Sequence, residues 1–372
     1  MSSGRKKINP RIRTLDFARG FLVAVTAFMT HILAAPQFAT WNTHADWYGL
    51  TVADLAFPIF ISLFGASMAI AYRKGVKKLR LLRRTILLIL IGLAFNAIVN
   101  WSFDLATLRF TGILQLYAVL GVLVVLITRV AGKWYQALGC AALIMIIYSG
   151  LLLLTSASYP QGLPQPSHNL SGIIDPLLFG PEHIYRQGQA GYDPEGVFTI
   201  ISAAANVLCG YAAGKLILER KKAAAVFYLL ILGAGLVLLT PLLAHYIPIA
   251  KKIWTPAFVS LTAGLTILLL ALSHLVFHTA DQKPLPKILA GIFWFFEAFG
   301  RNAFLVFFGK FVLIALMRHA TVPLHTETYH EVLSRWVFSW SPQPHLTYAF
   351  IMFALWTALT LFLHKKKKYL KI

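Results

Sequence analysis

The chain is poor in charge, and the charge that it has is mostly of one sign. Only 13% of its 372 residues are charged, and 34 Lys and Arg face 13 Asp and Glu. A soluble globular domain carries about a quarter charged residues, so this composition excludes an ordinary soluble fold. Cysteine is scarce too, since only Cys140 and Cys209 are present and both lie in apolar runs. They are expected to pack as small apolar residues, and neither a disulfide framework nor a thiolate site is indicated.

The chain instead contains long runs of apolar residues. Each is about twenty residues long, which is enough for a helix to cross the hydrocarbon core of a membrane. The sequence therefore predicts an all-α, polytopic integral membrane protein with about ten transmembrane helices, forming a single transmembrane domain over residues 1–372. The expected spans are 16–35, 52–72, 85–101, 110–129, 134–156, 196–218, 223–246, 255–277, 299–317 and 346–364. The first is too long for a signal-peptide core and is expected to remain uncleaved. The shorter segment 286–297 is expected to be a half-helix.

The basic residues fall mainly in alternate loops between these runs. Most of the 34 Lys and Arg lie on one side of the expected spans. The positive-inside rule then places both termini in the cytoplasm, with His44 and the long segment 157–193 on the outer side. Such loops also suit contact with anionic membrane lipid, so nucleic acid is not an expected partner. The segment 157–193 is too long for a plain connector, and a lid or an acceptor platform is expected there.

The stretch 42–73 places polar groups at the start of an apolar run. His44 lies just before the run, and Asp54 lies in its first turn. Thr51 and Asp54 have the spacing of a capping box, with Asp in place of Glu. A histidine is a suitable general base near neutral pH, but it can also simply hydrogen-bond within a loop. Asp54 likewise either caps its helix or acts at the site, by orienting His44 or by binding an acceptor amine, and the residues alone leave both interpretations open.

Four segments in order resemble one known family. They are LDFARG at 15–20, HADWYGLTVADLAFPIF at 44–60, RFTGILQ at 109–115 and YDPEGV at 192–197, with a weaker echo in GRNAFLVF at 300–307. The set is similar to the heparan-alpha-glucosaminide N-acetyltransferase family. LDFARG also resembles the start of a wider group of membrane acyltransferases. The resemblance implies a membrane acetyltransferase with acetyl-CoA as co-substrate, and it places the catalytic histidine at His44. From its position beside His44, Asp54 is expected to be a second catalytic residue.

On the donor side, the resemblance implies that acetyl-CoA enters from the cytoplasm. Arg19 is expected to bind the phosphates, because a guanidinium binds phosphate through a fork of donors; the alternative is an ion pair with Asp16. Arg84, in the basic segment 73–84, is expected to be a second contact. Thr30 stands where family members carry an asparagine that would polarise the thioester carbonyl, so the chain departs from the family pattern there. No metal is expected.

On the acceptor side, five residues are candidates for binding the substrate. Asp193 and Glu195 flank a proline, which is also the pattern of a helix start with Asp at the N-cap. Arg109 and Gln115 flank RFTGILQ, and an outer arginine is unusual in a chain that keeps its positive charge inside. Asn302 matches an asparagine of the family, and the helix that carries it is expected to line the cavity.

Together with this resemblance, the sequence predicts transfer of acetyl from cytoplasmic acetyl-CoA to the amine of a glucosamine-type sugar on the outer, periplasmic face, with His44 as general base. The resemblance implies that the acceptor is free glucosamine or a glucosamine-terminated glycan. Two alternatives stay open: an amino-sugar transporter, and an O-acyltransferase of envelope polysaccharide. A bacterial inner membrane is the expected location, and homodimerisation is left open.

Overall fold

The computed structural model describes residues 10–32, 43–282, 286–321, 326–333 and 338–370, and the regular elements in these ranges are helices. The long helices are α1 (Pro10–Ile32), α3 (Val52–Ala71), α4 (Lys78–Val99), α5 (Ile113–Val130), α6 (Trp134–Ser156), α8 (Val197–Glu219), α9 (Lys222–Tyr246), α10 (Pro256–Gln282), α11 (Lys287–Arg301), α12 (Ala303–His319) and α14 (Pro344–Lys365). The short ones are α7 (Leu170–Phe179), α13 (Tyr329–Glu331) and the 3-10 turns η2 (Pro160–Gly162), η3 (Pro181–His183) and η4 (Tyr185–Gly188).

Within the described ranges, eight helices are long and apolar enough to cross a membrane, and α11 with α12, bent by 67° at a short break, would make a ninth span. This confirms the prediction of an all-α polytopic membrane protein and roughly fits the expected ten spans.

The remaining expected span is α1, which carries Arg13, Asp16 and Arg19 in its first half. The segment expected to be a half-helix lies in α11. The basic segment 73–84, expected to be a loop, is partly helical, because α4 already starts at Lys78.

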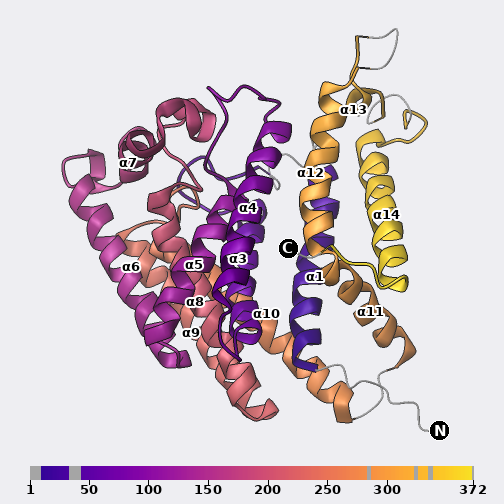
Figure 1. The fold of residues 1–372 in the computed structure, drawn as a ribbon, viewed down its shortest axis with the longest axis horizontal. Coiled ribbons are helices and arrows are strands. Elements are labelled where there is room, and N and C mark those ends of the chain that lie inside the picture. The colour runs from indigo at the N-terminus through magenta and orange to yellow at the C-terminus, as the bar shows by residue number, and fades with distance from the viewer. Residues whose placement is uncertain (1–9, 33–42, 283–285, 322–325, 334–337, 371–372) are drawn as a thin grey trace.

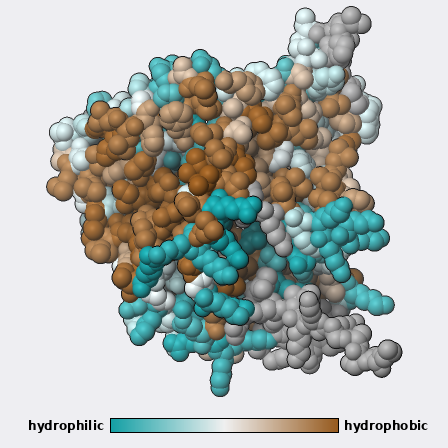
Figure 2. Space-filling model, in the orientation of Figure 1, coloured by the Kyte–Doolittle hydropathy of each residue, from teal (hydrophilic) through white to brown (hydrophobic). Residues whose placement is uncertain are grey.

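The helices run side by side in two groups (Figure 1). The larger group contains α3 to α10, and the smaller group contains α1, α11, α12 and α14. Helix α1 connects them, since it packs on α10 and α3 as well as on α11 and α14. The turns after α3, α5 and α8 lie at the same end as the start of α1, and we call this the basic end. Segments 43–51, 100–112, 157–196 and 247–255 lie at the other end, the histidine end. Figure 2 shows hydrophilic residues gathered below a broad hydrophobic band.

Small residues allow the closest helix crossings. A Cβ on Gly300 of α11 would lie 1.7 Å from the carbonyl oxygen of Asp16 in α1, and one on Gly210 of α8 would lie 1.8 Å from that of Ser62 in α3. Only glycine fits at such distances, and close backbone approach is the usual way in which membrane helices associate. Helices α1 and α11 are therefore held together as one pair, and α3 and α8 as another.

The long segment 157–193 is an ordered cap at the histidine end. It contains α7 and three short 3-10 turns, and α7 is capped by Asn169, whose side-chain oxygen accepts from the Gly172 N–H at 3.0 Å. The cap is joined to the loop that carries His44, because Trp47 Nε1 and Tyr48 Oη both donate to the Pro164 carbonyl at 2.9 and 2.5 Å. The segment in which a lid or an acceptor platform is expected is thus attached to the His44 loop by hydrogen bonds.

Candidate active site

His44 and Asp54 form a hydrogen-bonded pair at the histidine end. His44 Nδ1 lies 2.7 Å from Asp54 Oδ1, and the carboxylate is 1% exposed while the imidazole is 54% exposed. The other carboxylate oxygen, Oδ2, accepts from the Thr51 N–H at 3.0 Å, the Thr51 hydroxyl at 3.0 Å and the Ala45 N–H at 3.2 Å. The two roles left open by the sequence are therefore divided between two oxygens. Oδ2 caps the helix, and Oδ1 orients the imidazole.

This geometry defines what His44 can do chemically. When the imidazole is neutral, Nδ1–H donates to the buried carboxylate and Nε2 keeps its lone pair. The carboxylate fixes the orientation of the ring and stabilises the positive charge that forms when Nε2 accepts a proton. The pair is thus suited to act as a general base at an exposed surface.

Lys251, in the loop between α9 and α10, completes this cluster. Its Nζ lies 3.0 Å from His44 Nδ1, 3.2 Å from His44 Nε2 and 3.4 Å from Asp54 Oδ1, and its side chain is only 15% exposed. Burial lowers the pKa of the Lys251 ammonium, even though Asp54 and Glu195 act in the opposite direction. The sequence identified Lys251 only as one basic residue of an outer loop. The signal that was available is a pair of adjacent lysines on a side that otherwise has few positive charges.

A second cluster joins Arg109 to two carboxylates. The Arg109 guanidinium lies 2.6 Å from Asp193 Oδ1 and 2.7 Å from Glu195 Oε2. The Thr111 hydroxyl and the Tyr185 N–H also donate to Asp193, which is fully buried. Burial opposes the positive charge of Arg109, but the two carboxylates raise its pKa above the ordinary value. Three candidates for acceptor binding are therefore brought together, although Asp193 is already saturated with hydrogen bonds.

The expected helix start at Asp193 is wrong. Helix α8 begins at Val197, and it is Asp175 of α7 whose carboxylate accepts from the Val197 N–H at 2.8 Å. The Asp193 carboxylate is bound by Arg109 and Thr111, and its hydrogen bond from the Glu195 N–H at 3.0 Å belongs to a turn that ends before α8 begins. Burial raises the pKa of Asp175 to about 6. An acid from another element thus does what the local pattern assigned to Asp193.

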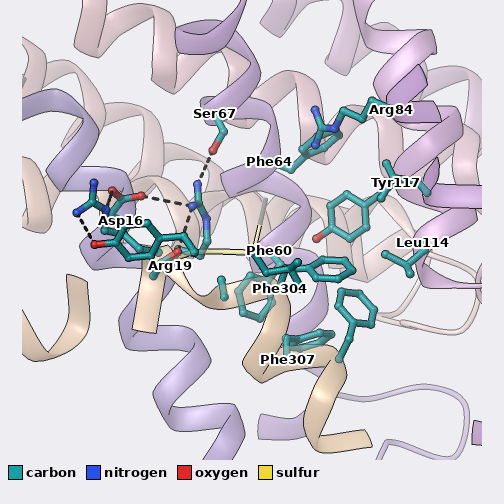
Figure 3. Close-up of a pocket in the computed structure, with 17 residues that line it drawn as sticks. Asp16, Arg19, Phe60, Phe64, Ser67, Arg84, Leu114, Tyr117, Phe304 and Phe307 are labelled. Carbon is teal, nitrogen blue, oxygen red and sulfur yellow. Dashed lines mark hydrogen bonds and ion pairs between the residues drawn. The ribbon is translucent and has the colours of Figure 1, made fainter. Parts of the chain in front are cut away.

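A cavity of about 550 Å³ opens between the two helix groups (Figure 3). Its lining residues are Asp16, Arg19, Phe60, Phe64, Ser67, Arg84, Leu88, Leu114, Tyr117, Gly300, Arg301, Ala303, Phe304, Phe307, Phe308, Tyr369 and Leu370. Arginines and aromatic rings dominate this wall. The cavity therefore offers positive charge together with a long apolar surface.

Two of its arginines are those expected to bind the donor. Arg19 donates to the Ser67 hydroxyl at 2.9 Å and to the Gly300 carbonyl at 3.3 Å, and it pairs with Asp16 at 3.4 Å. The Arg84 guanidinium lies over the Phe64 ring at 5.1 Å, and its buried Nε has no hydrogen-bond partner among the described residues. Arg84 is therefore the less committed of the two guanidinium groups.

The segment after α14 also lines this cavity. The Tyr369 ring lies 4.5 Å from the Arg301 guanidinium, and Arg301 donates to the Tyr369 hydroxyl at 3.0 Å. Neither residue was singled out from the sequence as a site residue. Nothing local indicates that the segment after the last helix returns to the end of α11, so this contact could be found only from the fold.

The remaining candidates lie outside both clusters. The Thr30 hydroxyl donates to the Thr26 carbonyl within α1 at 2.7 Å, and Thr30 does not line the cavity. Asn302 is buried at the break between α11 and α12, where its amide donates to the Ala298 carbonyl at 3.0 Å, and it is not a lining residue although its two neighbours are. Gln115 is buried beside the lining residue Leu114, and neither atom of its amide has a partner in the described part of the chain.

The cavity approaches the histidine cluster along α3. Its lining residue nearest to that cluster on α3 is Phe60, six residues from Asp54, which corresponds to about 9 Å of helix. The Phe57 ring lies between the two regions, 6.2 Å from the ring of the lining residue Tyr117. Ser67, at the basic end of the cavity, is about 20 Å along α3 from Asp54. The basic pocket and the histidine cluster thus lie at opposite ends of one helix.

These features define a polytopic membrane protein with a basic, aromatic pocket and a His–Asp–Lys cluster at opposite ends of its bundle. Residues 11–229 match the family model described as heparan-alpha-glucosaminide N-acetyltransferase, catalytic, and the chain belongs to this family.

Two curated relatives agree with this assignment. The heparan-alpha-glucosaminide N-acetyltransferase of Homo sapiens is 27% identical over 437 aligned positions, which cover 98% of this chain and 60% of that protein. The protein of the same name from Mus musculus is 26% identical, with 99% and 61% covered. The chain thus spans about three fifths of the length of these relatives. Lys251 lies beyond the segment matched by the family model.

Proposed function

We propose that this chain transfers the acetyl group of acetyl-CoA to the amine of a glucosamine-type sugar, either free glucosamine or a terminal glucosamine of a glycan. The names of the human and mouse relatives support this reaction and this substrate class. One observation carries the proposal. An exposed imidazole is hydrogen-bonded at 2.7 Å to a buried carboxylate, within the stretch that resembles the signature of the family.

In the proposed step, the acceptor nitrogen attacks the thioester carbonyl carbon and His44 Nε2 takes the proton that this nitrogen loses. The tetrahedral intermediate then collapses, the C–S bond breaks, and the proton held by the imidazolium leaves with the sulfur as free CoA. Asp54 supports the imidazolium while it exists. General-base assistance of this kind contributes about two to four orders of magnitude in rate.

The donor is proposed to occupy the basic pocket. Arg19 and Arg84 bind its phosphates there, because a guanidinium offers a phosphate paired charged donors. The aromatic wall suits the apolar part of an acyl-CoA chain, and the pocket continues from Ser67 towards Leu114. The buried amide of Gln115 has no partner in the part of the chain that the structure describes, and this residue is proposed to bind the acceptor substrate where the pocket meets the acceptor side.

Glu195, with Arg109, is proposed to bind the sugar on the histidine end, with Asp193 fixing Arg109 in place. Asn302 is proposed to hold the break between α11 and α12, which places its neighbours Arg301 and Ala303 in the cavity wall. Thr30 does not line the cavity and is proposed not to touch the reacting atoms. All described helices are proposed to form one domain over residues 1–372. The basic end is proposed to face the cytoplasm, with both termini there, and the membrane is proposed to be a bacterial inner membrane. This orientation rests on the concentration of Lys and Arg at that end.

The test is a reaction with purified protein in detergent. Acetyl-CoA and glucosamine should yield N-acetylglucosamine and one equivalent of free CoA, and His44→Ala should abolish most of the turnover. Release of CoA by His44→Ala at the parent rate rejects the mechanism. Two other results would each assign a different function. Movement of labelled glucosamine into vesicles without CoA release indicates a transporter. Acetylation of a sugar hydroxyl in preference to the amine indicates an O-acyltransferase.

A further inference from the structure

Lys251 is the one member of the histidine cluster that comes from the second half of the chain. It is separated from His44 by 207 positions, and no part of the family match covers it. The Lys251 ammonium nevertheless lies within 3.4 Å of both ring nitrogens of His44 and of Asp54 Oδ1. A charge so close to a proposed general base changes how readily that base takes up a proton.

The ammonium acts on the imidazole as a charge rather than as a hydrogen-bond donor. Its Nζ is almost equidistant from the two ring nitrogens of His44, at 3.0 and 3.2 Å. An atom that lay along the lone pair of one ring nitrogen would be much further from the other. Nδ1 is also already engaged by Asp54 at 2.7 Å. The lone pair of Nε2 therefore remains available to a substrate.

The position of Lys251 is fixed by its loop. The Gly49 N–H donates to the Ile249 carbonyl at 2.8 Å, which ties segment 247–255 to the loop that carries His44. Trp254, 1% exposed, donates from Nε1 to the Pro194 carbonyl at 3.2 Å. A lysine on a mobile surface loop would keep its ammonium in water. This one is held against the imidazole by buried neighbours on both sides.

A plain ion pair does not account for this arrangement. Besides His44, Asp54 accepts three hydrogen bonds from Thr51 and Ala45, so its charge is already stabilised. Removing an ammonium from water is unfavourable, and the contact of Lys251 Nζ with Asp54 Oδ1 at 3.4 Å offsets little of that free-energy cost. The positive charge of Lys251 therefore acts mainly on the imidazole of His44, because the imidazole is the neighbouring group that gains or loses a proton.

We propose that Lys251 is a positioning residue of the active site: its positive charge, held beside the imidazole, opposes a second positive charge on His44 and so leaves the lone pair of Nε2 able to accept a proton from the substrate. This inference rests on the proposed function. The charged groups that contact His44 are Asp54 from α3 and Lys251 from the α9–α10 loop. Glu195 and Lys252 act on Lys251, and Asp46 lies in the loop of His44, where its backbone carbonyl accepts from Lys252.

The test compares Lys251→Met with Lys252→Met across a pH series of acetyl transfer. Both variants lose one positive charge from the same loop, but only Lys251 contacts the imidazole. Without Lys251, His44 should be protonated more easily, so the pH of half-maximal kcat should rise by about one unit. KM for the acceptor should change less than kcat does at low pH. Lys252→Met should leave the midpoint in place, and Lys251→Arg should restore it.

A second readout does not depend on acetyl transfer. Diethyl pyrocarbonate modifies neutral imidazole, so the pH dependence of modification at His44, followed by peptide mass spectrometry, should shift upward in Lys251→Met and in Lys251→Gln. An unshifted modification curve in whichever of these variants folds overturns the inference. If the parent protein transfers no acetyl group, the proposed function fails, while the modification curve still decides the role of Lys251.

Discussion

The two ends of α3 differ in how completely their polar groups are paired. At the histidine end, Asp54 accepts hydrogen bonds from three residues and lies beside Lys251. At the basic end, Arg84 Nε has no hydrogen-bond partner within the described ranges, and the residue lies in an open cavity lined by phenylalanines. Chemistry requires groups that are fixed before the substrate arrives, whereas a pocket for a large donor requires unpaired charge that the ligand can satisfy. The difference predicts that changes at the first end reduce turnover and changes at the second reduce donor affinity.

The largest expected effect is that of His44→Ala. The variant should lose about three orders of magnitude in kcat, because the proton of the attacking amine has no acceptor. Its affinity for acetyl-CoA, measured by equilibrium binding, should match that of the parent. A variant that binds the donor much more weakly would show that the two ends are not separate in function.

Asp54→Asn should reduce kcat by about two orders of magnitude, because an amide has one acceptor oxygen for the two roles that Oδ1 and Oδ2 now fill. Asn is a competent capping residue, so the thermal stability of the protein in detergent should stay close to that of the parent. A variant with full activity and unchanged stability would show that Asp54 only caps α3.

Arg84→Gln should weaken acetyl-CoA binding about tenfold at low salt and less at high salt, because contacts to phosphate are largely electrostatic and are screened by ions. The value of kcat at saturating donor should hardly change. Arg80→Gln is the matched control, since Arg80 lies on the same helix but is exposed and outside the cavity lining. Equal effects in both variants would mean that the helix attracts the donor only through its overall charge.

The smallest effect is expected for Thr30→Val. The Thr30 hydroxyl donates to its own helix and lines neither site, so kcat should stay within about threefold of the parent, which corresponds to less than 1 kcal/mol. A much larger loss of kcat with unchanged donor binding would give Thr30 the polarising role of the family asparagine.

Local sequence signals predicted what is local in the structure. The apolar runs gave the helices, and the spacing of His44, Thr51 and Asp54 gave a helix start with a histidine beside it. The resemblance then assigned the catalytic role. Arg109 and Asp193 were both expected on the outer side, but their contact joins positions 84 apart and depends on the packing of α8. Lys251 and Tyr369 could not be predicted as site residues, because each reaches its partner only through the arrangement of the complete bundle.

The glycine crossing of α3 and α8 has a consequence for how a bulky molecule can enter. With Gly210 packed against the backbone of Ser62, α3 cannot shift without moving the most buried helix of the bundle. The opposite wall of the cavity is built by α1, α11 and α12, and α1 and α11 are themselves joined at Gly300. We therefore expect the entrance to widen by movement of this second wall relative to α3. The His44 imidazole is hydrogen-bonded to Asp54 of α3, so its orientation would not change in such a movement.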